Sequence, residues 1–214
     1  MTVLFVILTI VAFLAVDWLV RRGKEPAPVA ARATPPVRMP GGIFFARSHT
    51  WLNLFPSGRA WLGVDDFVAR LLDHPRVTFL AEPGARVKRG DPLFRLEEDG
   101  RAFTVRSPIA GEVLAVNDQL AEEPGLLHRA PFVDGWALEI APERPADLKS
   151  LLLGDETRRW MGDEFARLRD VLAGAGGVLQ PAMLQDGGPP VAGAMKLVGP
   201  EVWERFEKEF LEVR

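Results

Sequence analysis

The stretch that most constrains the fold of this 214-residue chain is residues 97–117, EEDGRAFTVRSPIAGEVLAVN. Asp99-Gly100 separates two segments in which apolar and polar residues alternate, a pattern typical of half-buried strands. An Asp-Gly pair in this position favours a two-residue type I′ hairpin turn. Ser107-Pro108 and Gly111 then form a second corner before another alternating segment, residues 111–116. The stretch therefore predicts a tight β-hairpin followed by a further strand.

The surrounding residues, 41–150, continue this pattern of short strands and turns. Residues 58–64, 77–80 and 136–140 are typical of strands, and residues 65–72 of a short helix capped by Asp65. Gly84, Gly90 and Gly111 fall at corners where a positive φ or a close backbone approach calls for glycine. Strands of this length and spacing predict a compact β-sandwich or flattened barrel.

Residues 43–150 resemble the glycine cleavage H proteins, a family of lipoyl carriers. Four motifs carry the resemblance in chain order: Phe45-x-x-x-His49-x-Trp51, Gly63-Val-Asp-Asp66-Phe67-Val-Ala69, Ser107-Pro108-x-x-Gly111-x-Val113-x-x-Val-Asn117 and Pro124-x-Leu-x-His128-x-x-Pro131-Phe132-x-x-Gly135-Trp136. The last motif has His128 where the family has Asn. The resemblance implies a mainly β fold, the barrel-sandwich hybrid of two small sheets found in lipoyl and biotinyl domains.

One residue departs from what the resemblance implies. The family's lipoylated lysine falls seven residues before the serine of the third motif, and that position is Gly100 here. Arg101 is adjacent, but a guanidinium stays protonated and is a poor acyl acceptor. The nearest lysine in sequence, Lys88, precedes a separate turn. We therefore expect a carrier scaffold that no longer carries a lipoyl group and binds no cofactor.

The first 24 residues predict a transmembrane anchor. Residues 2–20 contain one charged residue, Asp17, and about 20 apolar residues are needed to cross a bilayer. Arg21, Arg22 and Lys24 follow, so the positive-inside rule places the N-terminus outside and the rest of the chain in the cytoplasm. A cleaved signal peptide is the alternative, but the chain lacks a basic start and a small-x-small cleavage site. Residues 25–40, with five prolines, predict either a semi-rigid spacer or a disordered tether.

Residues 151–214 predict a helical C-terminal extension. A helix is expected from Asp155 to about Ala173, then a loop rich in Gly and Pro, and a final helix from about Pro200. The final helix carries an apolar stripe made of Val202, Trp203, Phe206 and Phe210. The stripe packs either on the β domain of the same chain or in a groove of a neighbouring subunit.

No catalytic or metal site is predicted. The chain has no cysteine, and its three histidines show no paired metal-ligand spacing. His49 and Trp51 either line a pocket or pack at the core edge, with packing favoured. Glu97, Glu98 and Asp99 are expected to form a solvated charge cluster rather than an acid–base pair. A net charge of −3, with no basic patch, argues against nucleic-acid binding.

The sequence thus predicts four segments: an anchor (1–24), a linker (25–40), an H-protein-like β domain (41–150) and a helical extension (151–214). The favoured function is non-enzymatic. It is that of a membrane-anchored subunit with a structural or assembly role in a respiratory or photosynthetic membrane complex, with membrane lipid and other protein subunits as partners. Two alternatives remain: a working carrier in lipoate or one-carbon metabolism, and a lipoyl-like adaptor of a transport system.

Overall fold

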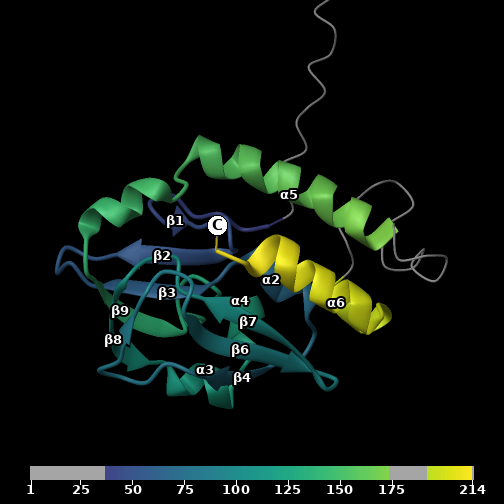
Figure 1. Ribbon diagram of the computed structural model, residues 1–214, viewed down its shortest axis with the longest axis horizontal. Helices are drawn as coiled ribbons and strands as arrows, with labels where there is room; N and C mark the ends of the chain where they lie inside the picture. Colours follow the sequence, from purple (N-terminus) through teal and green to yellow (C-terminus); the bar gives the residue numbers. More distant parts are fainter. Residues whose placement is uncertain (1–36, 174–191, 214) are drawn as a thin grey trace, which may run out of the picture. The chain divides into compact units, whose positions relative to one another are not determined.

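The computed structural model describes residues 37–173 and 192–213, and these contain two antiparallel sheets (Figure 1). The larger sheet has the strand order β1-β2-β3-β9-β8-β5. Its strands are β1 (Phe44–Phe45), β2 (Thr50–Leu54), β3 (Ala60–Val64), β9 (Leu138–Pro142), β8 (Gly111–Val116) and β5 (Arg86–Val87). The smaller sheet has the order β4-β6-β7, with β4 (Arg76–Phe79), β6 (Pro92–Glu98) and β7 (Arg101–Arg106).

One continuous hydrophobic core holds the sheets together. It takes alternate residues from the strands, such as Leu62, Phe94, Leu96 and Val113, each essentially inaccessible to solvent. Period-2 alternation puts these side chains on the inner faces and leaves polar neighbours such as Arg95 outside. Two antiparallel sheets around one core agree with the expected mainly β, lipoyl-type fold.

Two corner glycines show why the chain needs that residue. A Cβ on Gly111 would lie 2.5 Å from the carbonyl oxygen of Ala141 on the neighbouring strand, so any side chain would force β8 and β9 apart. Gly84 has a φ of +87°, in the left-handed region. Both predictions of glycine-dependent corners are confirmed.

Short helices connect the strands. These are α2 (Asp66–Leu71), α3 (Asp118–Glu122), α4 (Leu126–Arg129) and the 3₁₀ turn η1 (Pro145–Ser150). The predicted N-cap of α2 is confirmed, since the Asp65 carboxylate accepts a hydrogen bond of 3.1 Å from the backbone N–H of Val68. The cap satisfies one of the free donors at the start of this helix.

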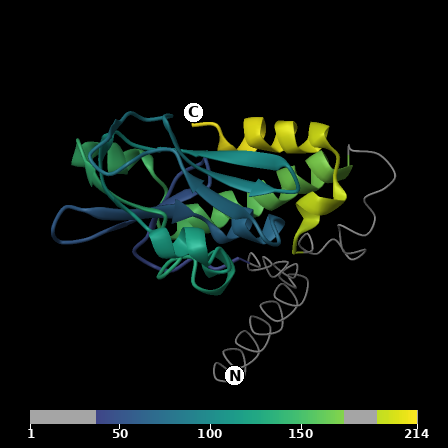
Figure 2. The same ribbon diagram turned by 90° about the horizontal axis from the view of Figure 1, so that it is seen from below.

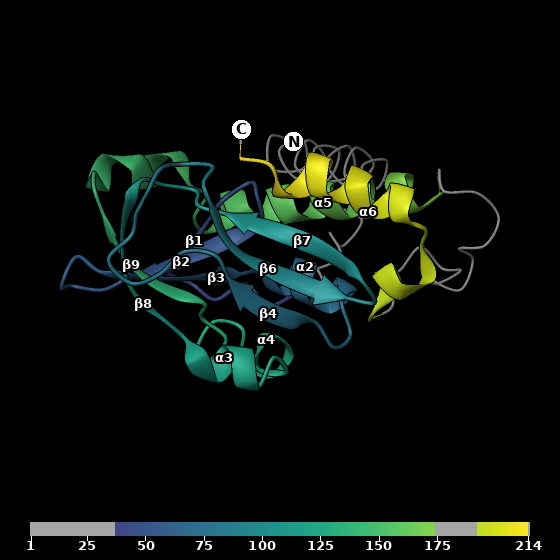
Figure 3. The same ribbon diagram turned by 60° about the horizontal axis from the view of Figure 1, so that its bottom comes forward.

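The C-terminal extension packs on the β domain of its own chain. It consists of α5 (Asp155–Ala173), the 3₁₀ turn η3 (Ala194–Leu197), α6 (Pro200–Phe206) and a π-helical turn, η4 (Glu207–Leu211). The yellow segment α6–η4 lies beside β7 in Figures 2 and 3, and Trp203 stacks on Phe103 at 4.3 Å between ring centroids. The backbone N–H of Thr104 donates to Glu207, so the extension also covers the outer edge of β7. Of the two alternatives for the apolar stripe, packing within the chain is the one observed.

The predicted anchor, residues 2–20, lies outside the described residues, as does most of the predicted linker. Within residues 37–173 and 192–213, no helix combines the length and apolar character needed to span a bilayer. The last residues of the predicted linker pack on the β domain: Val37 is buried, and the Arg38 guanidinium binds the buried carboxylate of Asp66 at 2.6 Å.

Candidate functional site

The turn between β6 and β7 contains the position at which the resemblance implies a lysine. Glu98 pairs with Arg101 across the hairpin, so the turn consists of Asp99 and Gly100 alone. Their φ angles are +51° and +77°, and two successive positive values are the signature of the predicted type I′ turn. Asp tolerates the left-handed region better than most residues with a side chain, and Gly enters it without strain. The predicted turn is confirmed.

Glu98 does not belong to a solvated cluster, and that expectation is wrong for this residue. Its side chain turns inward and is 5% exposed. Its carboxylate accepts hydrogen bonds from the backbone N–H groups of Asp73, at 3.0 Å, and His74, at 2.6 Å. These bonds attach the hairpin to the loop that follows α2. Asp99, in the turn itself, is exposed as expected.

Lys196, from η3 of the C-terminal extension, reaches the same place. Its ammonium lies 2.7 Å from the Asp73 carboxylate and 3.8 Å from that of Glu98. The hydrogen bond from Lys196 lowers the pKa of Asp73, and the same bond raises the pKa of Lys196. Lys196 is therefore a charged partner of the loop rather than a free amine.

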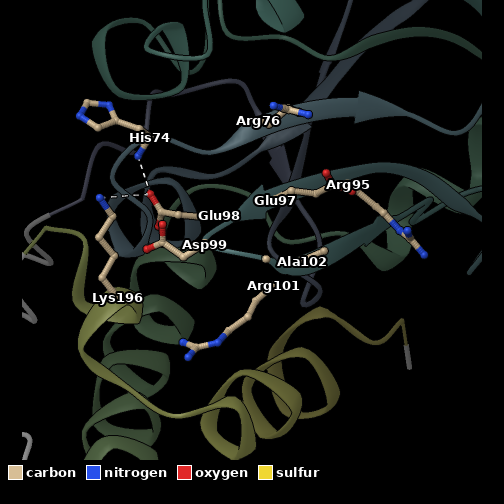
Figure 4. Close-up of a pocket in the computed structure, with 10 residues that line it drawn as sticks. His74, Arg76, Arg95, Glu97, Glu98, Asp99, Arg101, Ala102 and Lys196 are labelled. Carbon is tan, nitrogen blue, oxygen red and sulfur yellow. Dashed lines mark hydrogen bonds and ion pairs between the residues drawn. The ribbon is translucent and has the colours of Figure 1, made fainter.

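An open groove of about 630 Å³ surrounds the turn (Figure 4). Its lining is charged and mixed in sign: His74, Arg76, Arg95, Glu97, Glu98, Asp99, Gly100, Arg101, Ala102 and Lys196. On the side of the extension, Arg101 donates to the carbonyl oxygen of Val198 at 2.7 Å and lies over the ring of Trp203. The C-terminal extension thus contributes Lys196 to the lining of the groove and holds Arg101 beside it.

Among the described residues that line the groove, Lys196 supplies the one amine. Gly100 has no side chain, and the ammonium of Lys196 is paired with the carboxylates of Asp73 and Glu98. Lys88 lines a different surface groove, beside β5 and β8. In the described part of the chain no three His, Cys, Asp or Glu side chains are placed to hold a metal ion.

His49 and Trp51, the residues weighed between pocket and packing, are both completely buried. Trp51 lies across Gly63 and donates its indole N–H to the carbonyl oxygen of Val64 at 3.0 Å. His49 lies between two buried carboxylates, Asp65 and Glu164. Sequence reasoning missed this cluster because Glu164 belongs to the distant helix α5.

Two small antiparallel sheets carrying a tight, exposed hairpin turn define a lipoyl-type β domain. The chain belongs to the glycine cleavage H-protein family: the sequence model described as "Glycine cleavage H-protein" matches residues 43–164.

Two relatives, from rice and Hydrogenovibrio, agree with this assignment. The mitochondrial glycine cleavage system H protein of Oryza sativa subsp. indica is 35% identical over 111 residues, which cover 52% of this chain and 67% of the relative. The glycine cleavage system H protein of Hydrogenovibrio crunogenus is 33% identical over 114 residues, covering 53% and 88% respectively. The solved structure of the H protein from Mycobacterium marinum matches with a TM-score of 0.49 and 19% identity, covering 59% of this chain and 98% of that one.

Proposed function

We propose that this chain is a non-catalytic H-protein-like subunit that acts through the surfaces of its β domain and not through a lipoyl group. The observation that carries the proposal is the hairpin turn. Its Asp99-Gly100 pair supplies no amine, and Lys196, which lines the same groove, forms ion pairs with Asp73 and Glu98. The chain has the fold of a lipoyl carrier, but glycine stands at the position where the family has its lipoylated lysine.

The C-terminal extension supports the same proposal. Arg101 and Thr104 of β7 are engaged by Val198 and Glu207 of the extension. One side of the hairpin is therefore occupied by the chain itself, a poor arrangement for a carrier whose arm must reach other proteins. Such an arrangement suits a module with a fixed structural role.

The finer form of the proposal places this module in a membrane complex. Residues 2–20 are apolar over a length that matches a bilayer, and Arg21, Arg22 and Lys24 follow them. We propose that this segment anchors the chain in the cytoplasmic membrane, with the β domain in the cytoplasm. There it would serve as a structural or assembly component of a respiratory or photosynthetic complex.

Family membership favours a second candidate, a working carrier. The relatives in rice and Hydrogenovibrio are glycine cleavage system H proteins. If the chain is a working carrier, a lysine elsewhere in the sequence must accept the lipoyl group, because position 100 is glycine.

Intact-mass measurement separates the two candidates. The full chain is produced together with a lipoate ligase and free lipoate, with an authentic H protein as positive control. The non-carrier proposal predicts an unmodified mass of 23.6 kDa for this chain and full modification of the control. A lipoyl adduct on any lysine of the unaltered chain would establish the carrier instead.

The membrane proposal needs its own experiment. Native membranes are solubilised gently, and the size of the species that contains this chain is measured. We expect co-migration with other subunits well above the 23.6 kDa of one chain. Recovery as a lone monomer, or complete release from membranes by alkaline carbonate, would overturn it.

A further inference from the structure

A second cluster of charged side chains lies in the interior, away from the hairpin turn. The proposed function assigns no role to it. It is centred on His49, whose side chain has no exposed surface. His49 also has a φ of +58°, which is uncommon for a residue with a side chain. Buried histidines in unusual backbone conformations are worth testing for a specific role.

Both ring nitrogens of His49 face carboxylates. Nδ1 lies 2.8 Å from an oxygen of Asp65, and Nε2 lies 3.6 Å from an oxygen of Glu164. A neutral imidazole carries one N–H, whereas an imidazolium carries a proton on each nitrogen and turns one N–H toward each carboxylate. The Nδ1 contact is a hydrogen bond, and the longer Nε2 contact is an ion pair beyond hydrogen-bond distance. The geometry therefore fits the charged form.

The rest of the surroundings is aromatic and dry. Phe67 of α2 stacks on the imidazole at 4.4 Å between centroids, and Trp160 of α5 and Phe210 of η4 lie at 4.9 and 5.9 Å. Burial by itself would lower the pKa of His49, but the two carboxylates outweigh it and raise that pKa to about 9.

The members of this cluster come from parts of the chain that are far apart in sequence. His49 and Asp65 belong to the β domain, and Glu164 belongs to α5. Arg167, also on α5, binds both Glu164 oxygens at 2.7 and 2.8 Å and donates to the carbonyl oxygen of Glu209 in η4. The His49 cluster (His49, Asp65, Glu164 and Arg167) thus joins the β domain to both parts of the extension.

We propose that His49, carrying a proton on both ring nitrogens, is the ionic link that holds the C-terminal extension on the β domain, so that docking of the extension depends on that proton. With His49 charged, the two carboxylates are balanced by two cations. When the proton leaves, the carboxylates of Asp65 and Glu164 face a neutral ring, and Arg167 is the cation of the cluster that remains. The other neighbours of the imidazole are the rings of Phe67, Trp160 and Phe210, which carry no charge to balance the carboxylates.

The direction of the pH effect follows from linkage. A pKa raised on folding means that the stabilisation is complete below the ordinary value of 6.5 and is lost as the pH rises through about 9. The strands β8 and β9 should keep their protection, because neither contains a member of the cluster.

Hydrogen exchange on the full chain between pH 6.5 and 10.5, with exposure times scaled to the intrinsic rate, tests the proposal. We expect α5 and α6–η4 to lose protection with a midpoint near pH 9, while β8 and β9 stay protected. Glu164→Gln removes one of the two carboxylates and should lower that midpoint by at least about 1 pH unit. Arg158→Gln, on the exposed side of the start of α5, should leave the midpoint unchanged.

A measurement on the unaltered protein keeps the test decisive if a variant fails to fold. The ¹⁵N chemical shifts of the His49 ring should show both nitrogens protonated at pH 7.5. A neutral ring at that pH, or protection of α5 that does not change up to pH 10.5, would overturn the proposal and leave His49 as a packing residue.

Discussion

At the scale of single residues, Gly100 is required for its backbone conformation and not because a side chain would clash there. A Cβ at Gly100 would meet no atom within 4 Å, yet its φ is +77°. We therefore expect Gly100→Ala to lower the free energy of unfolding by about 1–2 kcal/mol through backbone strain alone. Gly100→Asn should lose less, because Asn tolerates the left-handed region. Urea denaturation of the three proteins measures both differences.

Gly162, exposed in the middle of α5, is a matched control for these variants. It too has no atom within 4 Å of an added Cβ, but its backbone is helical. Gly162→Ala should therefore raise stability by about 0.5–1 kcal/mol, the opposite sign. Equal stability of the wild type, Gly100→Ala and Gly100→Asn would mean that the turn does not hold the type I′ conformation.

The orientation of Glu98 could be predicted from the sequence, but its partners could not. Three acidic residues at a hairpin tip were expected to be solvated together. The period of two places Glu98 on the same face of β6 as Leu96, which is buried, so the signal for an inward carboxylate was present. Its partners, the N–H groups of Asp73 and His74 and the ammonium of Lys196, could not be predicted because folding alone brings those segments to the hairpin.

At the scale of elements, periodic segments were predicted well and very short ones were not. The 3.6-residue spacing of apolar residues defined α5, and the same reasoning located the buried stripe of α6 and η4. The two-residue strands β1 and β5 have no recognisable period, and they exist because longer neighbours pair with them. In the final helix, Trp203 packs on Phe103 of β7, a partner that no local sequence pattern indicates.

Docking of α6 on β7 gives a prediction at this scale. Trp203 is buried, stacks on Phe103 and donates its indole N–H to the carbonyl oxygen of Met195 at 2.9 Å. Trp203→Ala should lower the free energy of unfolding by about 3–5 kcal/mol, the usual cost of a large cavity. Glu204→Ala, one residue further on and exposed, should change it by less than about 0.5 kcal/mol. Similar small losses in both variants would show that the extension contributes little to the folded state.

At the scale of the whole molecule, the described chain is held together by charged contacts between distant segments as well as by its core. Lys196 joins η3 to the loop after α2, and the His49 cluster joins α5 to the β domain. Arg38 does the same at the other end, since it binds Asp66 of α2 and the carbonyl oxygens of His128 and Arg129 in α4. Motif spacing predicted the β domain, but these long-range ion pairs depend on the complete fold.

Arg38 and Val37 fall within the predicted linker, so the start of the folded unit can be tested directly. Two chains are compared, one beginning at Pro35 and one beginning at Gly41. The second lacks the buried side chain of Val37 and leaves the Asp66 carboxylate, which is itself inaccessible to solvent, with Arg70 as its remaining cation. We expect it to be less stable by about 2–4 kcal/mol, from the lost apolar burial and the broken ion pair.

Arg38→Ala in the longer chain separates the two contributions and should account for more than half of the loss. The pKa of Asp66 is held low in the folded protein: burial opposes the ionised form, but the bonds from Arg38 and the charge of Arg70 outweigh it. The stabilisation from this carboxylate is present above its unfolded pKa and is lost as the pH falls through its lower folded pKa. The difference between the two chains in chemical denaturation should therefore be full at pH 7 and shrink at strongly acidic pH. A difference that is absent at pH 7 would place the start of the folded unit after residue 40. A difference that is present but does not change with acid would show that burial of Val37, and not the Arg38–Asp66 ion pair, accounts for it.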